Sequence, residues 1–457
     1  MKKQIIILIS IILIGIMLVL IGGCTNNLDK CDLNKDGKVS AIEKQKCEQP
    51  TDGGTKGKCG DGICGTVEKE RGICPEDCEE EPTTTQLYQD SPFGAHGGYM
   101  GLSEIGIKYK RSAGNNALIW DLVEPELDTN YKWDDFDKLL EAADSFGLKL
   151  MVTIIPMNTK DQISCGKCSQ GDERCKRKNP CSWEKYSEFL TSAINRYKDR
   201  IKYWQIENEP AAGHYYDGTS GEYAELLLKS YKSIKDSCSD CKVIIAGMAD
   251  YRPTQVEYYK GIFSYLKNTE CAESGCFDIF DFHTSDYTKL TDNYDSTVSL
   301  LSKYGYSDKP IWSTEFGPLH NTPACEAQEN KEIGDELIKS FAVALDTGFE
   351  KLFWRTHECP SWIINKEGEK TNAYYAYKTL INKIEGFDSV SKLAEGQYKF
   401  KINEKDIYVL WCDSVSCSLP SEIAGELKVT DYYGNEEAMS ANKIILSESP
   451  IFAEIKS

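Results

Sequence analysis

Histidine is scarce in this chain, and positive charge is outnumbered by negative charge. The five histidines are scattered, and no two of them stand four residues apart, the spacing at which a helix presents two zinc ligands. This pattern disfavours a metal hydrolase, and we expect catalysis without a cofactor. Acidic residues number 72 against 53 basic ones, a formal net charge of -19, and no basic patch interrupts this excess. A nucleic acid is therefore not an expected partner, because its phosphates need cationic neutralisation.

An apolar run opens the chain. It extends from Ile5 to Ile21, follows two lysines and ends in small residues before Cys24. A basic start, an apolar stretch and a small-residue end are typical of an export signal. Because the segment up to Cys24 resembles a lipobox, we expect residues 1–23 to be a signal peptide and Cys24 to carry a lipid; an uncleaved membrane anchor is the alternative. Either way, the rest of the chain is expected outside the cell, tethered to the outer face of the cytoplasmic membrane.

Cysteine usage indicates the same compartment. The chain has 19 cysteines, and 18 remain when Cys24 is set aside, an even number as a disulfide framework requires. Most of them form close groups. One group of four could instead bind zinc through its thiolates, although an oxidising compartment favours disulfides. That group consists of Cys165, Cys168, Cys175 and Cys181.

Residues 24–50 contain a loop that resembles an EF-hand. Oxygen-bearing side chains, a central glycine and a final acid recur at the spacing that binds Ca²⁺. We expect weak binding of one ion, because the family pairs two such loops and this segment has one; a solvated acidic loop without an ion is the alternative. The ligands would come from Asp32, Asn34, Asp36, Lys38, Ser40 and Glu43.

Residues 51–79 resemble small cysteine-rich modules of extracellular proteins, with the patterns Cys-Gly-Asp-Gly-Ile-Cys and Cys-Pro-Glu-Asp-Cys. A segment this short cannot bury enough apolar surface to fold unaided, so two disulfides are expected to hold it, in a structural or spacer role. Residues 80–89 follow with acidic residues, proline and threonines, a composition typical of an extended linker.

Strand-like and helix-like segments alternate over residues 90–385. Helical apolar spacing separates the strand-like runs, which predicts an α/β protein. Eight such runs fit a closed (β/α)₈ barrel better than an open sheet. They end near His96, Arg111, Pro156, Asn208, Ala246, His283, Glu315 and Trp354. Residues 386–457 then show short alternating strands, at 398–402, 407–411, 427–429 and 443–446, which predict a small antiparallel β domain.

Two glutamates stand at the ends of predicted strands. Glu209 follows the fourth strand and Glu315 ends the seventh, so only closure of a barrel would bring them together. The carboxyl ends of barrel strands form the active site. Two carboxyl groups about 5 Å apart are what retaining glycoside hydrolysis requires. A structural role for each acid alone is the alternative.

The run Asn208-Glu209-Pro210, together with Glu315 three strands later, resembles clan A of the glycoside hydrolases over residues 90–385. The resemblance implies cleavage of β-glycosidic bonds, with Glu209 as acid/base and Glu315 as nucleophile. It also implies that Asn208 binds the sugar 2-hydroxyl and that Arg111 orients the nucleophile. The small β domain is similar to that of the β-xylosidase and α-L-iduronidase type.

Four further residues at strand ends have expected roles. Trp354 would form the floor of the sugar subsite, as the resemblance implies. His96 and His283 are expected to contact sugar hydroxyls or the nucleophile, and Tyr287 stands close to where clan members place a tyrosine, although it lies beyond the strand end.

Two cysteines that lie far apart in sequence are expected to pair. Cys325 and Cys359 follow the seventh and eighth predicted strands, whose loops are neighbours on one barrel face, so a disulfide between them is geometrically reasonable. The expected partner of the whole protein is a carbohydrate. Two other functions remain open: a sugar-binding lipoprotein without turnover, and a transglycosidase that uses the same residues.

Overall fold

The computed structural model describes residues 90–456, except 170, 172–176, 214, 285, 319–330 and 357–360. The signal segment with Cys24, the Asp32 to Glu43 loop, the cysteine-rich module and the linker lie outside the described residues. The predicted Cys325–Cys359 pair lies outside them as well. Within the part that is described, no helix is both long enough and apolar enough to cross a membrane.

Eight parallel strands form a closed barrel, as the sequence predicts. Neighbouring strands pair in order around it, β1 also pairs with β9, and parallel bridges Ile244–Ile279 and Met248–Phe282 join β6 to β7. The strands are β1 (Phe93–His96), β2 (Tyr109–Ser112), β4 (Lys149–Ile155), β5 (Tyr203–Ile206), β6 (Lys242–Ile244), β7 (Phe280–Asp281), β8 (Ile311–Phe316) and β9 (Lys351–Arg355). A short strand that the sequence did not predict, β3 (Leu118–Ile119), pairs with the end of β4.

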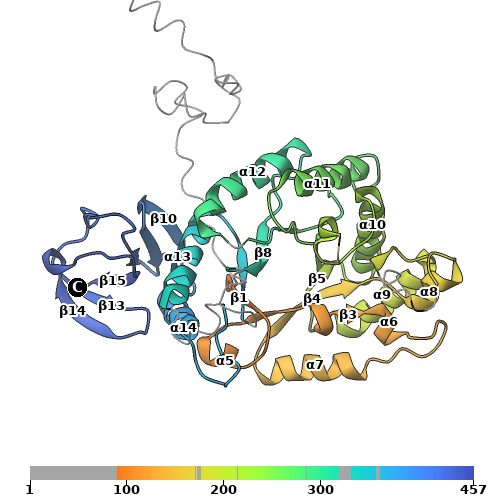
Figure 1. Ribbon diagram of the computed structural model, residues 1–457, viewed down its shortest axis with the longest axis horizontal. Coiled ribbons are helices and arrows are strands. Elements are labelled where there is room, and N and C mark those ends of the chain that lie inside the picture. Colours follow the sequence, from red (N-terminus) through yellow and green to blue (C-terminus); the bar gives the residue numbers. More distant parts are fainter. Residues whose placement is uncertain are drawn as a thin grey trace, which may run out of the picture. The chain divides into compact units, whose positions relative to one another are not determined.

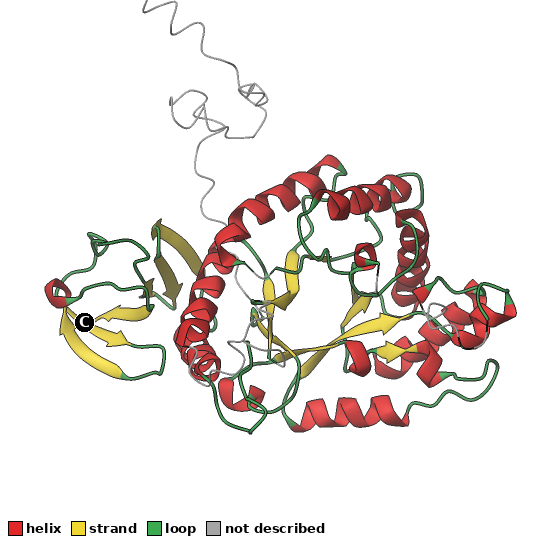
Figure 2. Ribbon diagram, in the orientation of Figure 1, coloured by secondary structure: helices red, strands yellow, loops and turns green. Residues whose placement is uncertain are grey.

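Helices surround these strands (Figures 1 and 2). Their buried faces carry the apolar positions that recur at helical spacing, such as Tyr186, Phe189 and Leu190 in one helix. The long helices are α7 (Asp134–Ser145), α9 (Trp183–Tyr197), α10 (Ser220–Ser237), α11 (Pro253–Leu266), α12 (Leu290–Lys303), α13 (Lys331–Thr347) and α14 (Asn372–Ile384). Short helices α5 (Leu102–Ile105), α6 (Trp120–Val123) and α8 (Thr159–Ser164) lie in the connections.

Large side chains fill the barrel interior. Tyr109, Trp312 and Phe353 belong to a buried cluster contributed by different strands. Phe353 fits because Gly94 has no side chain: a Cβ there would come within 2.6 Å of the Phe353 ring. The interior is thus a packed core, which leaves the strand ends for chemistry.

The C-terminal sheet has six antiparallel strands in the order β10-β11-β12-β15-β13-β14. The predicted strand at 443–446 is wrong: residues Ala441–Lys443 form a 3₁₀ turn, and Ile445 is 92% exposed, so its apolar character does not mark a buried face. Three strands of this sheet were not predicted from sequence: the two edge strands β10 and β14, and β15, which lies between β12 and β13. The strands are β10 (Ser389–Ala394), β11 (Gln397–Ile402), β12 (Lys405–Leu410), β13 (Glu426–Thr430), β14 (Glu436–Ser440) and β15 (Ile451–Ile455).

Helices α13 and α14 connect the barrel to this sheet. Lys339 of α13 donates to Asp413 at 2.5 Å, and Lys383 of α14 donates to Glu436 and Glu454, each at 2.8 Å. The barrel and the sheet also share one hydrophobic core.

The described disulfides close short loops. They are Cys165–Cys181, Cys238–Cys241, Cys271–Cys276 and Cys412–Cys417. The first of them uses two of the four cysteines that could have bound zinc, and Cys168 is disulfide-bonded too. The three described cysteines of this group are therefore disulfide-bonded, as the sequence favours.

Candidate active site

The two predicted carboxylates meet at the carboxyl ends of the barrel strands. Glu209 lies three residues beyond β5, and Glu315 lies within β8. One carboxylate oxygen of each and one ring nitrogen of His283, which follows β7, all lie within 4.8 Å of one another. Barrel closure therefore brings together residues that are 106 positions apart in the sequence.

Positive charge surrounds Glu315. Arg111 Nη1 donates to one carboxylate oxygen at 2.5 Å, and Arg355 Nη2 donates to the other at 3.2 Å. His96 lies 4.0 Å from the same carboxylate. Burial opposes ionisation of Glu315, but the charges of His283, Arg111, His96 and Arg355 hold its pKa well below the usual range. Glu315 is thus an ionised carboxylate at neutral pH.

Arg111 is held in place from β5. Its guanidinium donates to Gln205 Oε1 through Nε and Nη2, at 3.1 and 2.7 Å, and to Asn208 Oδ1 at 2.6 Å. Arg111 is 1% exposed, so the contacts satisfy a buried cation. Asn208 accepts through its carbonyl oxygen, so its NH₂ group is the part that can donate to a ligand.

Glu209 contacts His283. The imidazole Nδ1 lies 2.6 Å from Glu209 Oε1, and Nε2 lies 3.1 Å from Asp281 Oδ2 and 3.1 Å from Thr314 Oγ1. Burial lowers the pKa of His283, but the charges of Glu315 and Asp281 and the hydrogen bonds to Asp281 and Glu209 together raise it to about 9. At neutral pH the ring is therefore a cation that donates to a carboxylate on each side.

Gly247 makes room for this ring. A Cβ at position 247 would lie 2.2 Å from His283 Nε2, which is too close for the imidazole to keep its position. The glycine follows β6, so the strand next to β7 shapes the space that His283 occupies.

Four residues of the site escaped prediction from sequence. They are Gln205, Asp281, Thr314 and Arg355. Asp281 accepts hydrogen bonds from the Thr314 backbone N–H, from the Thr314 hydroxyl and from Gln205 Nε2. These hydrogen bonds join β5, β7 and β8 beneath the carboxylates. Period-two alternation could have found Asp281, which precedes His283 by two residues and so shares its face of the strand.

Two predicted contacts differ from expectation. Trp354 is completely buried, its indole N–H donates to the Ser361 carbonyl, and its ring packs against Phe316 and Phe341. This burial lends no support to a sugar platform, which needs an exposed face. Tyr287 lies in a 3₁₀ turn, Tyr287–Lys289, packed against the hydrophobic core. Among the described residues, no hydrogen bond links it to the network of the carboxylates.

The cluster of Glu209, His283 and Glu315 has a spacing that a metal ion would also accept. Arg111 and Arg355 already neutralise Glu315, and His283 is itself a cation at neutral pH. A further positive ion would be repelled by these groups. The donor set therefore fits proton exchange better than metal binding.

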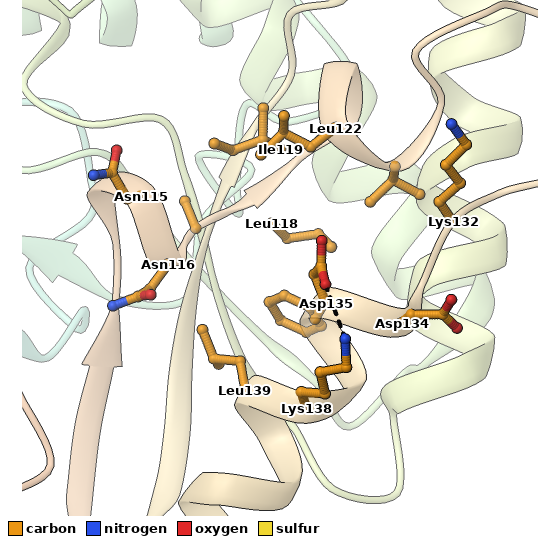
Figure 3. A pocket seen from close by; sticks show the side chains of 13 residues that line it. Asn115, Asn116, Leu118, Ile119, Leu122, Lys132, Asp134, Asp135, Lys138 and Leu139 are labelled. Carbon is orange, nitrogen blue, oxygen red and sulfur yellow. Dashed lines mark hydrogen bonds and ion pairs between the residues drawn. The ribbon is translucent and has the colours of Figure 1, made fainter.

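A separate pocket of about 480 Å³ lies between helix α7 and the segment that contains β3 and α6 (Figure 3). Its lining mixes amides such as Asn115 and Asn116, the charged Lys132 and Asp135, and apolar side chains such as Leu139. None of its lining residues belongs to the network around Glu209 and Glu315. The pocket is thus distinct from the carboxylate site.

No family model and no curated protein sequence matches this chain. Its fold nevertheless resembles solved structures. A family 39 glycoside hydrolase from the gut symbiont Bacteroides cellulosilyticus WH2 matches with a TM-score of 0.62 at 14% identity, over 80% of this chain and 81% of that one.

Two further structures give similar values. A GH39 β-xylosidase from Caulobacter crescentus matches with a TM-score of 0.58 at 13% identity, over 82% of this chain and 97% of that one. A glycoside hydrolase family 30 subfamily 8 xylanase from Clostridium acetobutylicum matches with a TM-score of 0.51 at 14% identity, over 80% and 97%. Such identities show a shared fold, which is the (β/α)₈ barrel with a small β domain that the sequence predicts.

Proposed function

We propose that this chain is a retaining glycoside hydrolase that cleaves β-glycosidic bonds in oligo- or polysaccharides by double displacement. The observation that carries the proposal is the placement of two carboxylates within 4.8 Å, one between two arginines and the other on an imidazole. The two carboxylates therefore lie in different electrostatic environments, as the different tasks of a nucleophile and an acid/base require. The shared fold with glycoside hydrolases supports the same conclusion.

In the first step, Glu315 attacks the anomeric carbon while Glu209 protonates the departing oxygen. The low pKa of Glu315 keeps the nucleophile ionised, and Arg111 and Arg355 hold its two oxygens in place. The Asn208 amide can donate to the sugar 2-hydroxyl, an interaction that strengthens as positive charge develops on the ring.

In the second step, Glu209 accepts a proton from water, which attacks the glycosyl ester at Glu315. His283 Nδ1 lies 2.6 Å from the Glu209 carboxylate, so the imidazolium can stabilise the ionised Glu209 that is left after the first step. The proton that Glu209 then takes from water restores its acid form for the next cycle.

A screen of aryl β-glycosides and polysaccharides tests the proposal, and any substrate found fixes the sugar and linkage. Glu315→Ala should then lose activity by several orders of magnitude on every substrate. Glu209→Ala should lose far less on substrates with activated leaving groups, and azide should restore its rate as a β-glycosyl azide. With Glu315→Ala, azide should give the inverted α-azide instead. Equal losses without either azide product would contradict the assigned roles.

The place of action is a further proposal. We propose that the chain is exported and held at the outer face of the cytoplasmic membrane through a lipid on Cys24, and that the Asp32 to Glu43 loop binds one Ca²⁺. The disulfides of the barrel support an oxidising compartment. Mutation of Cys24 to Ser should abolish lipid attachment, and Glu43→Gln should abolish calorimetric Ca²⁺ binding.

A further inference from the structure

A buried carboxyl group that the mechanism does not use stands two residues before Glu209. Glu207 is 1% exposed and follows the last residue of β5. Its backbone N–H donates to the Ile154 carbonyl at 3.0 Å, so the main chain of Glu207 still belongs to the barrel wall. Its charge acts on tyrosines of helices α9, α10 and α11 and on Tyr216 of the loop before α10, so its side chain lies near them.

The backbone at this point is strained. Glu207 has a φ of 67° and Glu209 a φ of 37°, both in the left-handed region that residues other than glycine rarely adopt. Each such residue costs roughly 1–3 kcal/mol and persists only where its surroundings hold it. The two strained residues enclose Asn208, so this turn sets the direction of both Asn208 and Glu209.

The Glu207 side chain itself holds the turn. Its Oε2 accepts from the Asn208 backbone N–H at 2.6 Å. On the other side of the turn, Asn208 Oδ1 accepts from Arg111 and Glu209 accepts from His283. The Asn208 peptide is therefore fixed by the Glu207 carboxyl group, whereas the side chains of Asn208 and Glu209 belong to the network around Arg111 and His283.

Four tyrosines lie close enough to Glu207 for its charge to raise their pKa, and each of their hydroxyls has another hydrogen-bond partner. Tyr186 bonds Ser230, Tyr216 bonds Asn179, Tyr223 bonds the Ile206 carbonyl and Tyr258 bonds the Gly218 carbonyl. Burial raises the pKa of Glu207 to about 8, the Asn208 N–H opposes this rise, and no cation among the described residues contributes. The carboxyl group is thus mostly uncharged at neutral pH, which removes the cost of burying a charge.

We propose that Glu207 is a positioning residue: its buried carboxyl group accepts from the Asn208 N–H, holds this left-handed turn and so aims Glu209 at the glycosidic oxygen and Asn208 at the sugar. This role deepens, and rests on, the proposed glycosidase function. Misplacement of an acid by about 1 Å can cost on the order of 100-fold in rate. The loss should fall on the step that needs proton transfer.

Glu207→Met tests the role, because methionine fills a similar volume and offers no acceptor for the Asn208 N–H. Glu207→Gln keeps an acceptor oxygen. We expect Glu207→Met to lose about 100-fold in kcat/KM on an aryl glycoside with a poor leaving group, and only a few-fold on a dinitrophenyl glycoside. Glu207→Gln should stay within about threefold of the wild type on both. Equal losses on the two substrates, or a Gln variant as poor as the Met variant, would overturn the proposal.

Glu336→Gln is a control for the loss of a carboxyl group with a raised pKa: Glu336 is half-buried on α13, and burial raises its pKa to about 7. A readout that needs no activity is the ¹⁵N resonance of His283 Nδ1, which reports its bond to Glu209. We expect this resonance to shift in Glu207→Met and to stay in Glu336→Gln and Glu207→Gln. If the wild type hydrolysed no glycoside, the proposed function would fail, and an unmoved resonance in Glu207→Met would still refute the positioning role.

Discussion

The two ends of the barrel bury charge in opposite ways. At the carboxyl end, Arg111, Glu315 and His283 form a network of opposite charges. At the other end, Lys351 is 3% exposed, donates to the Ser91 carbonyl and lies 3.9 Å from the centre of the Tyr109 ring, with the Asp90 carboxylate 3.8 Å away. Arg111 and Lys351 are both buried cations, but only Arg111 belongs to a network that contains several carboxylates.

The pKa values record this difference. The carboxylates at the catalytic end raise the pKa of His283 to about 9 despite its burial, whereas burial lowers the pKa of Lys351 to about 8 against the weaker attraction of Asp90 and Glu350. Charge at the carboxyl end is thus stabilised and available for proton exchange. At the other end, burial disfavours the charge of Lys351, so this charge reduces the stability of the fold.

The largest effect should come from the centre of the network. Arg111→Met should lower kcat/KM by at least about 1,000-fold and destabilise the fold by roughly 3–5 kcal/mol, because Glu315 and Gln205 lose a buried partner. Steady-state kinetics and urea unfolding measure the two effects. A loss below tenfold would mean that Arg355 alone suffices to hold the nucleophile, and the two ends would then differ less than their structures indicate.

A smaller loss should follow from crowding His283. Gly247→Ala places a methyl group where the imidazole now lies, so we expect about 100-fold lower kcat/KM from the displaced ring. Gly98→Ala is the control, because a Cβ there meets nothing within 4 Å. If both alanine variants kept full activity, His283 would have no part in catalysis.

The pH dependence of stability should show a defined sign at the catalytic end. The folded-state pKa of His283, about 9, exceeds the unfolded value near 6.5, so its stabilisation is complete below about pH 6.5 and is lost as pH rises through 9. Unfolding free energies of the wild type and His283→Gln should therefore converge over this interval, by on the order of 3 kcal/mol. Parallel curves would contradict the buried ion pair.

The opposite end should show the opposite sign and almost no effect on catalysis. The folded-state pKa of Lys351, about 8, lies below the unfolded value near 10.4, so wild-type stability should rise relative to Lys351→Met between about pH 8 and 10.4. The kcat of Lys351→Met should stay within about twofold of the wild type. A larger fall would show that this end also contributes to the chemistry.

The strands of the barrel were predictable because most are short, largely apolar runs that alternate with segments of helical spacing, although β2 carries Lys110 and Arg111. The convergence of Glu209 and Glu315 was predictable from their places at strand ends, since these ends meet once the barrel closes. The bridge from Asp281 to Gln205 was not predictable, because it depends on side-chain directions across three strands. The pairing of Arg355 with Glu315 likewise needs the register of β8 and β9, which a single sequence does not contain.

The wrong predictions from sequence fall where apolar character did not correctly indicate whether a residue is buried or exposed. The resemblance implied that Trp354 forms the floor of a sugar subsite, but its side chain is completely buried in the hydrophobic core. In the C-terminal sheet, the apolar residues around Ile445 led to a predicted strand that does not exist, although Ile445 is exposed. Strand β14 was missed because most of its residues are polar. In an edge strand with both faces partly exposed to solvent, apolar and polar residues alternate only weakly, so the sequence pattern alone does not locate the strand.

The pairing of Cys412 with Cys417 has a consequence for the lifetime of the molecule among proteases. These are the only cysteines after residue 386, so no covalent crosslink can join the C-terminal sheet to the barrel. One cut in the connection after α14 would leave the sheet attached by packing and by the ion pairs of Lys339 and Lys383. A nicked molecule should therefore migrate whole through a native gel and fall into two pieces in detergent, even without reductant.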